Sequence, residues 1–144
     1  MSSIRHLLDL KKETLFTIQP EATLKDALRI MTQKCIGSLL VMENDRLVGI
    51  INERDFIRKV SVKGRDIRGS HVRDIMTSKV ITAHPEQTVN ECMELMERNN
   101  LSHLPVVIND KVIGVISRRD LMRDIIYQHK KKMAKLDGIL IDGK

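Results

Sequence analysis

Two four-residue stretches combine side chains that could hold a phosphorylated sugar. They are Ser117-Arg118-Arg119-Asp120 and Asn52-Glu53-Arg54-Asp55, and each follows an apolar run that contains a glycine. The pattern predicts a strand end followed by a helix start, where backbone N–H groups and the helix dipole favour a phosphate. Ser117 can donate a hydroxyl hydrogen bond, Arg119 can pair with phosphate oxygens, and Asp120 can accept both hydroxyls of a ribose. A plain helix cap with a first-turn carboxylate would explain the same residues without any ligand.

The two stretches are equivalent positions of an internal duplication. A shift of about 65 residues places 17–56 over 82–121 without a gap, and about 13 of the 40 aligned positions are identical. The identical pairs include Gly49 with Gly114 and Asp55 with Asp120. Since chance does not give such agreement, we expect both copies to contain the same elements.

Each copy is predicted to hold a strand, a helix, a β-hairpin and the start of a second helix. The strands are expected over 16–20, 38–42, 46–51, 80–85, 104–108 and 111–116. The hairpins should turn at Asn44-Asp45 and Asn109-Asp110, since both residue types tolerate the left-handed backbone of a tight turn. One copy has too few apolar residues to cover its own sheet, so the two should pack as one domain.

The helices carry recognisable start signals. Thr23 and Thr88 are predicted N-caps, and Asp26 and Glu91, three residues on, should complete capping boxes. The second helices are expected to begin near residues 53 and 118. The basic run Lys130–Lys132 should form a solvated face of a final helix, over about 129–140.

Composition narrows the classes of function. The net charge of +6 and the pI near 9.5 favour anionic partners, while an aromatic content of 2% argues against single-stranded nucleic acid stacked on exposed rings. Cys35 and Cys92 show no metal-ligand spacing and are predicted to be buried, reduced thiols. No Gly-Lys-Ser/Thr phosphate loop and no activated nucleophile is present, and we expect a cytoplasmic protein that is not an enzyme.

The segment Gly114-Val115-Ile116-Ser117-Arg118-Arg119-Asp120, repeated at matching positions of a duplicated frame, resembles the signature of the CBS domain. CBS domains occur as tandem pairs called Bateman modules. The resemblance covers roughly residues 5–128. It implies an α+β or α/β fold of two pseudo-twofold related β-α-β-β-α repeats. The repeats are expected at 5–62 and 77–128, with a basic linker and the start of the second repeat at 63–76 and a helical tail at 129–144.

The resemblance also implies two ligand sites, each taking residues from both repeats. Site A is implied to consist of Ser117, Arg119 and Asp120 with Thr17, Ile18, Ile36 and Gly37. Site B is implied to consist of Asn52, Arg54 and Asp55 with Thr82, Ala83, Leu101 and Ser102. Arg58, Lys59 and His103 are expected to add positive charge near the phosphates. Site B departs from the family pattern, because Asn52 stands where a serine or threonine is expected.

The function implied is a regulatory module that binds an adenine nucleotide between its repeats. The ligand is expected to be AMP, ADP, ATP or another adenosyl compound such as NAD or S-adenosylmethionine. A homodimer and a regulated protein partner are expected, with no membrane association. Two alternatives remain: an interaction protein with vestigial pockets, and a basic nucleic-acid binder, which has no recognised DNA-reading motif in its favour.

Overall fold

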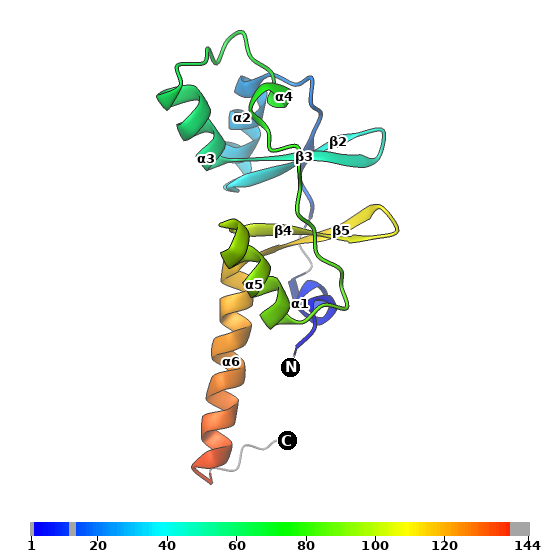
Figure 1. Cartoon of the computed structure of the whole chain (residues 1–144), viewed down its shortest axis with the longest axis vertical. Helices are drawn as coiled ribbons and strands as arrows, with labels where there is room; N and C mark the ends of the chain where they lie inside the picture. The colour runs from blue at the N-terminus through cyan, green and yellow to red at the C-terminus, as the bar shows by residue number, and fades with distance from the viewer. Residues whose placement is uncertain (1, 12–13, 139–144) are drawn as a thin grey trace. The chain divides into compact units, whose positions relative to one another are not determined.

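The computed structural model describes residues 2–11 and 14–138, which fall into two compact units (Figure 1). The first-repeat unit consists of residues 14–81 and 109–112. The second-repeat unit consists of the described residues among 1–13, 82–108 and 113–144.

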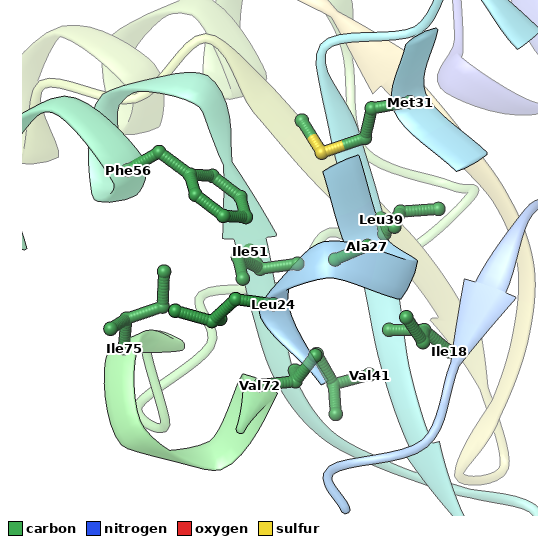
Figure 2. Packing of buried hydrophobic residues seen from close by; sticks show 10 residues of the cluster. All are labelled: Ile18, Leu24, Ala27, Met31, Leu39, Val41, Ile51, Phe56, Val72 and Ile75. Carbon is green, nitrogen blue, oxygen red and sulfur yellow. The ribbon is translucent and has the colours of Figure 1, made fainter. Parts of the chain in front are cut away.

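The first-repeat unit is a three-stranded sheet covered by helices. Its elements are β1 (Thr17–Ile18), α2 (Leu24–Lys34), β2 (Ser38–Glu43), β3 (Arg46–Asn52), α3 (Glu53–Asp55), the π-helix η1 (Phe56–Val62) and α4 (Val72–Ile75). The strand order is β1-β2-β3, with β1 parallel and β3 antiparallel to β2. Apolar side chains from α2, the strands and α4 meet in one core around Leu24, Val41 and Ile51, all buried (Figure 2). This burial stabilises the sheet because it removes apolar surface from water.

The second-repeat unit repeats this arrangement with two strands. Its elements are α1 (Ile4–Lys11), α5 (Val89–Asn99), β4 (His103–Ile108), β5 (Lys111–Ser117, of which the first two residues are assigned to the other unit) and the long α6 (Arg118–Leu136). The predicted hairpins are confirmed: Asn44, Asp45, Asn109 and Asp110 all have positive φ angles, between 49° and 65°. Tight turns of this kind match the twist of the flanking strands. The basic run 130–132 lies exposed on α6, and the part of the predicted tail beyond residue 138 lies outside the described residues.

Each unit contains the helix that precedes the other repeat in the sequence. Although α1 precedes the first repeat, the Ile4 N–H donates to Gln87 O at 3.0 Å. Correspondingly, α4 precedes the second repeat, and the Val72 N–H donates to Ala22 O at 2.8 Å. Ala22 and Gln87 are equivalent positions, so both helices are held by the same backbone bond. The compact units therefore exchange helices, whereas the predicted boundaries 5–62 and 77–128 follow the chain.

The predicted strand over 80–85 is wrong: only Ala83 pairs, in an isolated parallel bridge with Val106. In the first repeat the Leu40 N–H donates to Phe16 O at 3.4 Å, which helps to hold β1 beside β2. Pro105 occupies the equivalent place in the second repeat, and proline has no N–H to donate. One ladder bond is therefore missing, and the strand shortens to a bridge.

Of the two capping boxes predicted at Thr23 and Thr88, only the one at Thr88 is complete. Thr88 and Glu91 make both bonds, at 3.1 Å and 2.8 Å. Thr23 accepts from the Asp26 N–H at 3.0 Å, but the Asp26 carboxylate pairs with Arg29 and does not return to the Thr23 backbone. Arg29, three residues further along the helix, competes for the carboxylate. The capping-box pattern takes no account of such a competing cation.

The prediction that both cysteines are buried is wrong for Cys35. Cys92 is buried, but Cys35 is exposed and ends α2 with a left-handed backbone, φ 54°. The equivalent residue at the end of α5 is Asn100, φ 53°. Helices often end in this conformation, which asparagine tolerates better than most residues.

Replacing Cys35 with asparagine should therefore stabilise the chain by about 0.5 kcal/mol, because it relieves backbone strain at an exposed site. Urea denaturation of the variant and the parent measures the gain. The matched control is Asn100→Cys, which should lower stability by a similar amount. Equal stabilities for all three proteins would contradict the argument from the helix end.

Candidate functional site

The strongest candidate group is the junction between β5 and α6. The Ser117 N–H donates to Asp120 Oδ2 at 2.9 Å, and the Asp120 N–H donates to Ser117 Oγ at 3.1 Å. The two residues thus form a reciprocal capping box at the start of α6. The helix cap that the sequence allowed as an alternative explanation is therefore present. Any ligand would bind to groups that already cap α6.

Lys11 is the residue that sequence reasoning missed at this junction. Its Nζ donates to Asp120 Oδ2 at 2.8 Å and to Val115 O at 2.9 Å, and both charged side chains are less than one-fifth exposed. Burial by itself would raise the pKa of Asp120, but the hydrogen bond and charge of Lys11, with the bonds from Ser117, hold that pKa below its ordinary value. Asp120 is therefore an ionised carboxylate at neutral pH, and Oδ2 already has two donors.

The equivalent junction between β3 and α3 has the same geometry. The Asn52 N–H donates to Asp55 Oδ2 at 2.8 Å, and the Asp55 N–H donates to Asn52 Oδ1 at 3.0 Å. The amide of Asn52 thus replaces the serine hydroxyl without loss of the cap. Asp55 is buried, and Lys59 Nζ lies 3.5 Å from its Oδ1 while donating to Ile75 O at 2.7 Å.

The helix starts offer fewer open N–H groups than the sequence suggested. The Glu53 N–H donates to Gly37 O at 3.1 Å, and the Arg118 N–H donates to Ser102 O at 2.8 Å. Together with the capping boxes, these bonds satisfy the first and third N–H groups of each helix. A phosphate would therefore depend more on side-chain cations than on unpaired backbone groups.

These backbone bonds bring some of the predicted site residues together within each unit. In the first-repeat unit, Gly37, next to Ile36, is bonded to the start of α3, and Thr17 and Ile18 form β1 beside β2. In the second-repeat unit, the carbonyls of Leu101 and Ser102 accept from the guanidinium and the N–H of Arg118.

The remaining predicted residues also have defined surroundings in their own units. Ser102 Oγ lies 3.0 Å from His103 Nδ1, and Ala83 is bonded to the chain at residues 105 and 107, next to the exposed Thr82. Arg58 and Arg119 are exposed, whereas Arg54 is half-buried. The two halves of sites A and B thus belong to different units, and the pairing between them stays a prediction.

The described residues give little support for a metal site, a reactive cysteine or a membrane span. Among residues 2–11 and 14–138, no group of three or more His, Cys, Asp or Glu side chains could hold a metal ion. Burial, with a smaller contribution from Glu91, raises the pKa of the Cys92 thiol to about 11, which leaves it protonated and unreactive. Within the same part of the chain, no helix is both long and apolar enough to span a bilayer.

Comparison with known proteins agrees with the duplicated architecture. The family model of the CBS domain matches twice, over residues 8–62 and 72–127. The mitochondrial CBS domain-containing protein CBSX3 of Arabidopsis thaliana is 38% identical over 126 residues, which cover 84% of this chain and 61% of that relative. The chain thus spans about three fifths of the length of that relative.

Solved structures show the same fold. A crystallised CBS domain is 38% identical, with a TM-score of 0.83, and the match covers 88% of this chain and 99% of that one. A CBS domain pair crystallised with 5′-methylthioadenosine and S-adenosyl-L-methionine is 24% identical, with a TM-score of 0.77, and covers 89% of this chain and 98% of that one. The predicted fold class, with helices and strands in two CBS repeats, is confirmed, and the chain belongs to the CBS domain family, of which it carries two copies in tandem.

Proposed function

We propose that the chain is a regulatory module that binds an adenine nucleotide through Ser117, Arg119 and Asp120, without catalysing a reaction. The observation that supports it is the ionised, partly buried Asp120 beside an exposed arginine, directly after the glycine-containing strand β5. Asp120 Oδ1 can accept from ribose hydroxyls, and Arg119 can pair with a phosphate. A structural neighbour that binds two adenosyl compounds supports the same class of ligand.

In this proposal the ligand also touches the residues around Thr17 and Gly37, as in site A. One ligand that contacts both repeats would shift their packing, and a protein partner would respond to that shift. The second group, around Asn52 and Asp55, is proposed to form the weaker site. The cytoplasmic location also stays a prediction.

Calorimetric titration with AMP, ADP, ATP, NAD, S-adenosylmethionine and adenosine tests the proposal. Arg119→Ala should weaken AMP binding about tenfold, because a charge-assisted bond to the phosphate is lost, and should leave adenosine binding unchanged. Arg123→Ala, an exposed arginine on the same helix, is the matched control and should bind AMP like the parent. If millimolar concentrations of every adenosine compound fail to bind or to raise the melting temperature, the proposal fails.

A second candidate is an interaction protein whose nucleotide sites are vestigial. One observation favours it: Asp120 Oδ2 is already occupied by Lys11 and by the Ser117 N–H. This candidate predicts no response in the same titration. Homodimerisation is compatible with both candidates, and the exposed apolar side chains of Met122 and Ile126 on α6 support it. Light scattering after size exclusion gives the subunit number.

A further inference from the structure

The first-repeat unit contains a hollow in which only one lining residue, Lys59, is among those predicted for the nucleotide sites. Its volume is about 400 Å³, and it is lined by Lys59, Lys63, Arg65 and Asp74. Small-molecule sites range from about 300 to 1,000 Å³. Three cations and one carboxylate around one hollow favour a small anion that also carries hydroxyl groups.

The three cations that line this hollow differ in whether a carboxylate lies near them. Lys59 is engaged, since its ammonium donates to Ile75 O at 2.7 Å and lies 3.5 Å from the Asp55 carboxylate. Within residues 2–11 and 14–138, no carboxylate lies within ion-pair distance of Lys63 or Arg65. Two exposed cations beyond ion-pair distance of any described carboxylate give this part of the lining a positive potential.

The local backbone places these cations beside one another. Lys59 lies on η1, and Lys63 caps the C-terminus of this π-helix, whose wide turns are rare and occur often at functional sites. The chain then reverses at Gly64, which has a φ of +74° and donates its N–H to Val60 O at 3.0 Å. The turn brings Arg65 to the same hollow as the two lysines.

Asp74 adds a negative group to the lining of the hollow. Its Oδ2 accepts from the His71 N–H at 2.8 Å, and His71 Nδ1 lies 4.0 Å away. Among the described residues, no donor bonds to Oδ1, which can therefore accept a hydroxyl from a ligand. A bare phosphate would be repelled by this carboxylate, whereas a phosphate joined to a polyol could bind both the cations and the carboxylate.

We propose that the hollow binds a phosphomonoester that carries free hydroxyl groups, such as a sugar phosphate, with Lys63 and Arg65 on the phosphate and Asp74 on a hydroxyl. The site lies within one unit and shares only Lys59 with the residues proposed for the nucleotide. This second site goes beyond the proposed function, and the proposal would hold even if the chain bound no adenine nucleotide.

The test is calorimetric titration of the full chain with ribose 5-phosphate, inorganic phosphate and ribose as probes. Ribose 5-phosphate should bind more tightly than phosphate, and ribose should not bind measurably. Lys63→Ala and Arg65→Ala should each weaken ribose 5-phosphate binding about tenfold. Lys79→Ala removes an exposed lysine of the same unit outside the hollow, and should bind like the parent.

Asp74→Asn tests the role of the carboxylate separately from that of the cations. It should tighten the binding of inorganic phosphate, because a repelling charge is removed, and reduce the preference for ribose 5-phosphate over phosphate. Absence of ribose 5-phosphate binding at millimolar concentration, or unchanged binding in both cation variants, would overturn the proposal.

Competition with adenosine, which carries no phosphate, distinguishes this site from the nucleotide site. Saturating adenosine should leave the affinity for ribose 5-phosphate unchanged, and so should Asp120→Ala. If adenosine displaces ribose 5-phosphate, or if Asp120→Ala abolishes its binding, the probe occupies the nucleotide site and the separate site is wrong.

Discussion

Gly49→Val should lower the free energy of unfolding by about 3 kcal/mol, because valine overpacks a site closed by backbone. A Cβ atom at Gly49 would lie 2.5 Å from Met76 Sδ and 3.1 Å from Thr77 O. Met76 is flexible, but Thr77 exchanges two backbone bonds with Ile50, at 2.9 and 3.0 Å. The added side chain must therefore push the segment after α4 away from β3. Urea denaturation followed by circular dichroism measures the loss.

Gly69→Val is the matched control for this substitution. The nearest atom to a Cβ there is Asp66 Oδ2 at 3.8 Å, an ordinary contact with an exposed side chain. Its stability should change by less than about 0.5 kcal/mol. Shortening Met76 to alanine should recover only part of the loss in Gly49→Val, since Thr77 O remains. Complete recovery would show that the backbone is not the obstacle.

Local chemistry explains why much of the fold could be predicted. A tight turn depends on two residues, and Asn44-Asp45 and Asn109-Asp110 adopt the expected positive φ angles. Thr88 with Glu91 and Ser117 with Asp120 are each three residues apart, a spacing that fixes a helix start. The duplication then allowed each element found in one copy to be sought in the other.

Long-range packing explains most of what the sequence could not show. Lys11 reaches Asp120 across 109 residues of chain, and no local pattern marks it as the partner. The exchange of α1 and α4 between the units likewise leaves no periodic signal. Pro105 was visible in the sequence, but its effect on the strand over 80–85 depends on which N–H faces the neighbouring strand.

Asp120→Ala should lower the free energy of unfolding by about 2 to 3 kcal/mol, in addition to weakening nucleotide binding. The substitution removes one half of the capping box, the bond from the Ser117 N–H to Asp120 Oδ2, which contributes about 1 kcal/mol. It also leaves the mostly buried Lys11 ammonium without the Asp120 carboxylate. The ligand affinity of this variant must therefore be measured at a temperature at which its urea denaturation shows it to be folded. Asp120→Asn keeps a cap acceptor and removes the charge, so it should lose less stability than Asp120→Ala.

The pH dependence of stability should report the Lys11–Asp120 pair. The pKa of Asp120 is lowered in the folded chain, so the unfolded state takes up a proton first as the pH falls. The stabilisation is complete above the unfolded pKa, about 4, and is lost as the pH drops through the folded pKa. Lys11→Met should be less stable than the parent at pH 7, and the difference should shrink below pH 4.

A double-mutant cycle decides whether this pair is specific to the second repeat. Lys11→Met and Asp120→Asn should show a coupling of about 1 to 2 kcal/mol at pH 7, because the ions are 2.8 Å apart and mostly buried. Lys59→Met and Asp55→Asn form the matched cycle in the first repeat. Their coupling should be smaller, since those ions are 3.5 Å apart and Lys59 already donates to Ile75 O. Equal couplings would mean that the duplicated junctions hold their carboxylates alike, and that Lys11 does not distinguish the two candidate nucleotide sites.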